Sequence, residues 1–271
     1  MSVGGRSRES LIVAELWRFL QSFAAITAEN AIRYLVFAGL AWLLAYRLLA
    51  ARWAHRKVVA KQPTTADVRR EVLWSASSIL VFGLVGAVTY QAVRAGWTRM
   101  YFGEPLADPG WFVASIVLTI ALHDTWFYWT HRWMHRPAVF RVVHRVHHLS
   151  TNPSPWAAYS FHPFEALVQA AIFPLAVLLV PMHPLAFVVF MVWQITFNVL
   201  GHTGHEYHPH WLMDSWLGKV LNTPTNHAMH HETFRGNFGL YANVWDRLMG
   251  TNHPDYEARF RTVTTRSRSG A

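Results

Sequence analysis

Long apolar segments separated by short polar ones set the pattern of this chain. Three of them are each close to the ~20 residues that a helix needs to cross the hydrocarbon core of a membrane, namely residues 31–51, 71–93 and 111–130. Two further apolar runs, 164–180 and 185–200, are joined by Pro181, His183 and Pro184, and they either cross or dip in as a hairpin. The pattern predicts an all-α integral membrane bundle.

The segment before the first span is amphipathic. After a polar start, Ile12, Leu16, Phe19 and Phe23 recur at helical spacing, which predicts an interfacial helix. The predicted organisation is therefore an interfacial helix and two spans in residues 1–110, a histidine-rich region with the third span and the hairpin in 111–251, and a polar basic tail in 252–271.

Basic residues predict the orientation of the spans. The loop after the first span carries several of them, at Arg52, Arg56, Lys57, Lys61, Arg69 and Arg70, whereas the loop 94–110 has only Arg94 and Arg99. The excess of positive charge places the first loop in the cytoplasm. The third span then returns to that side, and an even number of later passages brings His202 back to it. Every histidine-rich segment should thus form a helical cap on the cytoplasmic face.

Composition narrows the functional classes. The chain is 52% hydrophobic and only 14% charged, which favours a membrane protein. Its formal charge of +9 does not indicate nucleic-acid binding, because the basic residues flank apolar spans; anionic headgroups and an acidic electron-transfer partner fit better. The absence of cysteine excludes disulfides, cysteine-ligated iron–sulfur clusters and thiolate zinc sites.

Histidine is concentrated in one region. Of the 17 histidines in the chain, 15 lie between His123 and His231. They form one HxxxH and two HxxHH boxes, whose spacings of three and four place the imidazoles of each box on one helical face. The box residues are His131, His135, His144, His147, His148, His227, His230 and His231. A single zinc usually takes four ligands, so these eight predict a polynuclear metal site.

Other polar residues extend this prediction. His202 and His205 are three apart, so on a helix they could complete the ligand shell. Asp124, Glu206 and Asp246 are candidates for hydrogen bonds to the ligand N–H groups, with helix caps or surface contacts as the alternative. The Glu-x-x-His pairs of soluble di-iron bundles are missing. The pattern therefore indicates a metal site held mainly by imidazole, a ligand that suits iron, zinc, copper and nickel.

The boxes resemble those of the fatty acid hydroxylase / sterol desaturase superfamily of membrane oxygenases. The resemblance extends to the leader DTWFYWTHR and the trailer NFGLYANVWDRLMGT, and covers roughly Leu122 to Thr251. The HP dipeptide at His162, followed by Glu165, is also similar, and we expect a supporting role for it.

The resemblance implies an enzyme that oxidises an unactivated C–H bond of a lipid to an alcohol or an alkene. It implies two irons, which zinc can replace in isolated protein, together with O2. Electrons would come from a separate protein such as a ferredoxin or cytochrome b5 with its reductase, because the sequence has no Walker or GxGxxG motif.

The alternative is a membrane haem or metal-binding protein without oxygenase activity. A haem carrier should place paired histidines on facing spans instead of in compact boxes. A metal transporter should place ionisable ligands at the middle of the membrane. Here the histidines gather at one predicted edge, which favours the oxygenase.

Overall fold

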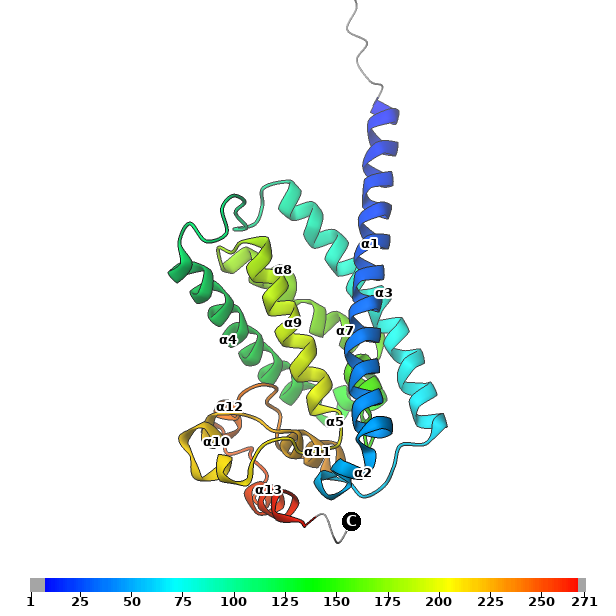
Figure 1. Ribbon diagram of the computed structural model, residues 1–271. Coiled ribbons are helices and arrows are strands. Elements are labelled where there is room, and N and C mark those ends of the chain that lie inside the picture. The colour runs from blue at the N-terminus through cyan, green and yellow to red at the C-terminus, as the bar shows by residue number, and fades with distance from the viewer. Residues whose placement is uncertain (1–7, 268–271) are drawn as a thin grey trace, which may run out of the picture.

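The computed structural model describes residues 8–267, which fold almost entirely into helices (Figure 1). Among these residues, four helices are long and apolar enough to cross a membrane. They are α1 (Arg8–Leu43), α3 (Thr65–Arg94), α4 (Pro109–Met134) and α9 (Pro184–Gly201). The predicted all-helical bundle is confirmed.

Polar caps begin these helices where the sequence changes from polar to apolar. The Thr64 hydroxyl accepts from the Asp67 N–H, while the Asp67 carboxylate accepts from the Thr64 N–H, so α3 begins with a capping box. Asp108 accepts from the N–H of Trp111, and Pro109 occupies the first position of α4. Both caps satisfy N–H groups that a helix start leaves unpaired, and so they fix where each helix begins.

α1 joins the predicted interfacial helix and the first predicted span into one helix of 36 residues. The predicted boundary at residue 30 does not interrupt the helix, because residues 8–38 contain no proline or glycine that would break it. The chain continues through a π-helical turn, η1 (Leu44–Leu48), and the short helices α2 (Ala50–Trp53) and η2 (Ala54–Arg56). An interfacial location for the first part of α1 stays a prediction.

α1 and α3 pack closely because α3 presents glycine to its neighbour. A Cβ atom added at Gly83 would lie 1.9 Å from Oγ1 of Thr27, and one at Gly86 would lie 2.7 Å from Cγ2 of Ile26. Small residues of this kind allow two helix backbones to approach where no water drives the association.

The second half of the bundle is a helical hairpin. α7 (Pro163–Ala170) and α8 (Ile172–Leu179) lead away from the histidine-bearing end, and α9 returns to it (Figure 1). At the far end the Tyr101 N–H donates to the Met182 carbonyl over 3.1 Å, so the hairpin turn contacts the loop between α3 and α4. The hairpin therefore extends along the bundle. Both residue 164 and residue 200 lie toward the histidine-bearing end, and the turn between α8 and α9 lies at the opposite end.

Short helices cover the end of the bundle that carries the histidine boxes. They are α5 (Pro137–Val139), η3 (Phe140–His144), α6 (Arg145–His148), η4 (Pro155–Tyr159), η5 (His210–Asp214), α10 (Trp216–Val220), α11 (Pro224–Thr233), α12 (Val244–Leu248) and α13 (Tyr256–Thr265). α13 lies in the predicted polar tail, yet Tyr256 and Phe260 are fully buried against Met213 and Met229. This cap is thus a packed layer.

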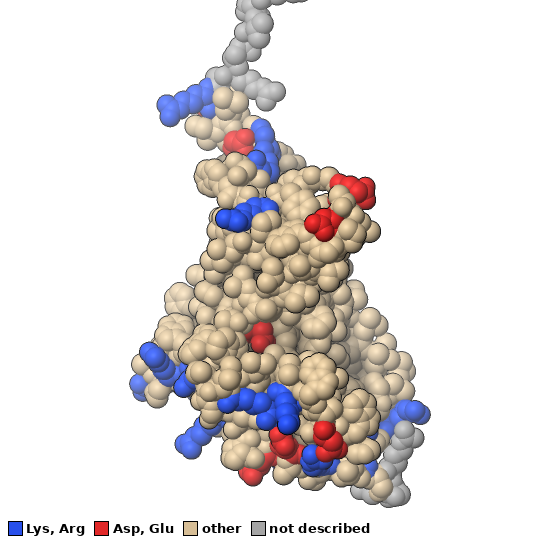
Figure 2. All heavy atoms as spheres, turned by 90° about the vertical axis from the view of Figure 1, so that its left-hand side faces the viewer, with Lys and Arg blue, Asp and Glu red and all other residues tan. Residues whose placement is uncertain are grey.

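Charge is unevenly distributed along the molecule. On the face seen in Figure 2, most lysine and arginine side chains lie toward the two ends, and the band between them is almost uncharged. Many large apolar side chains on the long helices are exposed, including Leu35, Leu80, Val117 and Val192. An exposed apolar band between charged ends matches the profile of a bilayer.

We expect Gly83→Ala to destabilise the bundle by about 1–3 kcal/mol, because its methyl group overlaps the Thr27 hydroxyl. Gly39→Ala in α1 is the matched control, since its Cβ would meet the nearest atom at 3.6 Å. Alanine is also the better helix former, so this variant should be neutral or slightly stabilised. Thermal unfolding in detergent measures both, and equal Tm values would contradict the close α1–α3 packing.

Candidate metal centre

Nine histidines converge into two adjacent groups at the capped end of the bundle. In each group the potential ligand atoms lie within 4.8 Å of one another. The first group contains His131, His135, His144, His148 and His230, and the second contains His147, His202, His227 and His231. The groups touch, because the rings of His148 and His231 are 4.8 Å apart between centroids.

Each HxxHH box is divided between the two groups. In the second box, His144 and His148 enter the first group and His147 enters the second. In the third box the division is reversed, with His230 in the first group and His227 and His231 in the second. The i,i+4 pair of each box thus shares one group, while the remaining histidine turns to the other. The prediction that all three imidazoles of a box point the same way was too simple.

Local backbone structure sets these directions. η3 is a π-helical turn that ends at His144, and such turns change the phase of the side chains that follow. α11 begins with Thr223 as its cap and Pro224 in its first position, and it ends at Phe234 in the left-handed conformation, with φ of 58°. All three histidines of the third box therefore lie within one short helix of fixed ends.

The imidazole Nε2 atoms are unusually close. In the first group, the Nε2 atoms of His135, His148 and His230 are each 3.1 Å from the other two. In the second, His202 Nε2 lies 3.0 Å from His227 Nε2 and 3.3 Å from His147 Nε2. Nitrogen ligands at about 2.1 Å from one metal ion and at right angles to each other are about 3.0 Å apart, which is this spacing.

The opposite ring nitrogens decide the protonation of these atoms. Nδ1 of His147 faces the Ser160 carbonyl at 3.3 Å, and Nδ1 of His202 faces the Asn198 carbonyl at 2.7 Å. A carbonyl oxygen only accepts, so each Nδ1 carries the proton and each Nε2 of these neutral rings has a bare lone pair. Two lone pairs this close repel each other unless a cation lies between them. The residues of both groups therefore fit a metal ion.

The Nδ1 atoms of four further histidines are held in the same way. Their partners are the Phe238 carbonyl for His131, the Gly236 carbonyl for His230, the Ser150 carbonyl for His231 and a Glu165 carboxylate oxygen for His144. Such partners fix the tautomer and the ring orientation of a ligand. The expected supporting role of Glu165 is therefore a 2.7 Å contact with a member of the first group.

Burial keeps these imidazoles neutral. It lowers the pKa of His227, His230 and His231 well below the ordinary value, and the neighbouring imidazoles lower it further. A metal ion binds only the neutral form of imidazole. The centre is therefore ready to bind metal at neutral pH without first losing protons.

The three carboxylates predicted to pair with ligand N–H groups contact other atoms. Asp246 accepts from the N–H groups of Phe238 and Gly239, and Asp124 accepts from those of Tyr241 and Ala242. They hold the loop whose carbonyl groups face His131 and His230. Asp124 and Asp246 thus support the ligands through this loop and not by direct hydrogen bonds to the imidazoles. Glu206 accepts from Thr225 at the start of α11 and contacts His208.

His205 lies outside both groups. α9 ends at Gly201 and the chain turns at Gly204, with φ of 67°, so His202 and His205 do not share a helical face. His205 Nδ1 contacts the Thr203 carbonyl, and its ring packs edge-on against Tyr46. The sequence analysis also gave no role to the carbonyl groups of Ser150, Gly236 and Phe238, since backbone atoms leave no side-chain signal.

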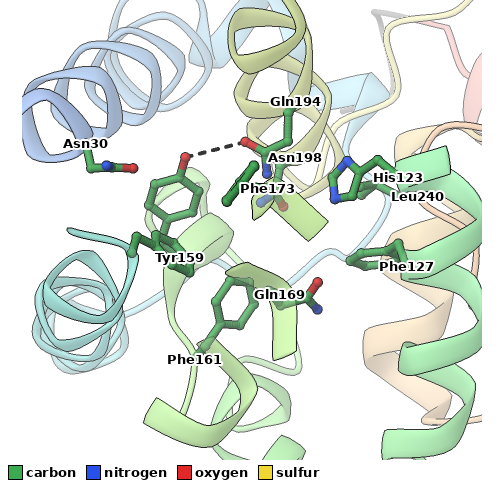
Figure 3. A pocket seen from close by; sticks show the side chains of 11 residues that line it. Asn30, His123, Phe127, Tyr159, Phe161, Gln169, Phe173, Gln194, Asn198 and Leu240 are labelled. Carbon is green, nitrogen blue, oxygen red and sulfur yellow. Dashed lines mark hydrogen bonds between the residues drawn. The ribbon is translucent and has the colours of Figure 1, made fainter. Parts of the chain in front are cut away.

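Two cavities border the centre. One, of about 200 Å³, is lined by His202 and His227. The other, shown in Figure 3, is about 20 Å³, and it is lined by Phe127 and Phe161, whose rings lie 5.0 Å from those of His131 and His147 respectively. The larger cavity therefore gives a small molecule access to the second group, and the smaller one has room for about one water.

This chain belongs to the Fatty acid hydroxylase family, whose model matches residues 116–251. The matched segment contains every histidine of the two groups, and it confirms the resemblance seen in the boxes. The members of this family act as enzymes on lipids, which places the buried histidines in an oxidoreductase scaffold.

The chain is also similar to fungal sterol desaturases. It is 28% identical to a Delta(7)-sterol 5(6)-desaturase of Gibberella zeae over 186 residues, covering 69% of this chain and 56% of the relative. A Delta(7)-sterol 5(6)-desaturase of Leptosphaeria maculans is 27% identical, with 84% and 60% covered. One of Aspergillus fumigatus is 30% identical, with 69% and 63% covered. The chain spans less than two thirds of these relatives, and no solved structure matches it.

We expect the wild-type protein to hold two metal ions per chain, and His230→Ala or His147→Ala to lose metal because each removes a ligand from one group. Elemental analysis of protein in detergent measures this. His205→Ala is the matched control, since His205 is equally buried but outside both groups, and it should retain both ions. Full metal content in His230→Ala would refute the assignment.

A second expectation concerns Glu165. Glu165→Leu removes the partner of His144 Nδ1 and should lower metal affinity by roughly 10–100-fold, measured by chelator competition. Glu165→Gln keeps an oxygen acceptor, so its loss of metal affinity should be near the lower end of this range, roughly tenfold. Glu232→Gln, at an exposed carboxylate, is the control and should bind metal as the wild type does.

Proposed function

We propose that this protein is a membrane-bound di-iron oxygenase that hydroxylates or desaturates a lipid. The observation that carries the proposal is the pair of touching, all-imidazole groups at one end of an apolar bundle. The five imidazoles of the first group exceed the four ligands of a structural zinc site, and the four of the second group lie in contact with them. Membership of the Fatty acid hydroxylase family supports the same chemistry.

Iron fits the donor set. Neutral imidazole suits iron as well as zinc and copper, and the carboxylate-poor shell distinguishes this centre from soluble di-iron bundles. When bound, two irons would supply the activation of O2 and the removal of hydrogen from an unactivated C–H bond. Zinc in isolated protein would then be a substitute for iron.

The chain's own residues orient the metal ligands and exclude water from the site of reaction. Carbonyl groups of Ser150, Gly236 and Phe238 hold protons on Nδ1, so that the Nε2 lone pairs point inward. Phe127 and Phe161 form apolar walls beside the two groups and exclude water from the reacting carbon. The protein thus orients its ligands and protects the reaction, while the metal carries out the difficult step.

A lipid is the substrate class that the surroundings favour. The relatives are Delta(7)-sterol 5(6)-desaturases by name, and cavities between the helices have largely apolar walls. Desaturation and hydroxylation both begin with loss of one hydrogen, so either product fits the same centre.

Electrons would come from a separate carrier, for which we favour an acidic protein of the ferredoxin or cytochrome b5 type. Arg136, Arg141 and Arg145 are exposed on the segment that carries the second histidine box. A basic face beside the centre would attract an acidic partner. The excess of basic residues in the first loop supports a cytoplasmic location for this face.

The test combines metal analysis with lipid analysis. Protein purified from an iron-57 culture should contain two irons per chain with a coupled Mössbauer signal. Membranes that contain the wild type, supplied with O2 and a reductase system, should convert a lipid to a product heavier by one oxygen or lighter by two hydrogens. The His230→Ala variant should not. A haem absorption band, or no metal, would refute the proposal.

A further inference from the structure

A charged pair lies within the first membrane-length helix. The Arg33 side chain is only 8% exposed, and its Nη1 donates to Glu29 Oε1 over 2.8 Å. Its Nη2 donates to Asn30 Oδ1 over 2.7 Å. We call Glu29, Asn30 and Arg33 the Arg33 cluster. Ionisable groups are costly within a bilayer and usually serve a function there.

The Arg33 cluster faces a large apolar cavity. This outer cavity of about 400 Å³ lies among α1, α3, α8 and α9, and side chains such as Phe187, Val188 and Met191 form much of its wall. Glu29 and Arg33 are its only charged wall residues in the described part of the chain. The cavity is large enough for a substantial part of a lipid molecule.

The outer cavity leads toward the metal centre. Asn30, Phe82 and Phe173 line both it and the small inner cavity of Figure 3, which borders the rings beside His131 and His147. In that view the Asn30 amide points toward Tyr159, whose hydroxyl faces Gln194. Asn30 thus links the Arg33 cluster to the inner cavity, and the rings of Phe82 and Phe173 lie in the wall that the two cavities share.

The chemistry of the cluster selects the kind of group it can bind. The Arg33 Nε–H is buried and makes no hydrogen bond among the described residues, although the Tyr159 hydroxyl lies beside the guanidinium. Glu29 already neutralises the guanidinium, so a carboxylate placed here would add an uncompensated negative charge in a medium of low dielectric. A hydroxyl or carbonyl oxygen could accept the free hydrogen bond without adding charge.

We propose that the Arg33 cluster binds an uncharged oxygen of the lipid substrate and so positions the carbon that is oxidised. The substrate is then a lipid that already carries a hydroxyl or carbonyl group, in preference to a free fatty acid or a plain hydrocarbon. This inference rests on the proposed oxygenase function. Arg33 would then be a residue that positions the substrate without contacting the metal ligands.

Photoreactive lipids test the proposal. Three probes of equal chain length with the same diazirine, an alcohol, a carboxylate and an alkane, are crosslinked to the metal-loaded wild type in detergent. Mass spectrometry then maps the labelled residues. We expect the alcohol to label wall residues such as Phe173 and Met191 at least roughly tenfold more than the other two, the factor that one hydrogen bond to a charged donor supplies.

Variants separate the roles of charge and shape. Arg33→Met should abolish the preference for the alcohol. Glu29→Gln leaves the guanidinium without its counter-charge, and should shift the preference to the carboxylate. Arg18→Met is the matched control, because Arg18 pairs with Glu15 on the same helix at 3.3 Å but is exposed, and its labelling should match the wild type.

Several results would overturn the proposal. These are equal labelling by alcohol and alkane, a preference of the wild type for the carboxylate, no labelling of the cavity walls, or labelling confined to Leu200 and Tyr207, which line the separate cavity beside His202. Metal content is measured on the same samples. If two metals are present and the preference is absent, only this inference fails, whereas the absence of metal means that the oxygenase proposal itself fails.

Discussion

The convergence of unprotonated Nε2 atoms is the constraint on which the rest of the structure depends. Carbonyl oxygens hold protons on the outer nitrogens of His147 and His202, so the lone pairs of their Nε2 atoms meet at 3.3 Å in the interior of the protein. Without a cation this arrangement is repulsive, and burial prevents relief through protonation. The cap, the loop carrying Gly236 and Phe238 and the carboxylates that anchor that loop all maintain this geometry.

The metal centre lies at the end of the bundle because its carbonyl partners come from loops and from the last turn of α9, where Asn198 faces His202. Inside a helix the carbonyl groups are used by the backbone, whereas the loops after α6 and α11 have carbonyl groups to spare. The long helices contribute His131 and reach His202, and short helices and loops provide the remainder. The apolar bundle below can therefore hold a lipid, while the polar cap holds the metals.

The Arg33 cluster is also electrically neutral, because the Arg33 guanidinium is paired with the Glu29 carboxylate. The Nε–H of Arg33 makes no hydrogen bond within the described part of the chain, and the cluster lies in the wall of the outer cavity. Recognition of an uncharged oxygen by a neutralised arginine would let an apolar cavity distinguish lipids that differ by one polar atom. Hydrophobic contact alone discriminates poorly between such lipids.

The sequence by itself determined the apolar spans and the eight box histidines, because hydrophobic period and i,i+4 spacing are local properties. The tertiary structure decided which histidines share a group, since a π-helical turn before His144 and the loop partners of Nδ1 are invisible to spacing. It likewise brought His202 into the second group and left His205 outside, because α9 ends before His202 and the chain turns at Gly204. The sequence does not reveal this turn. The position of Arg33 beside a cavity was also decided by the tertiary structure. The cavity forms only where α3, α8 and α9 pack against α1, and the sequence of α1 does not indicate this packing.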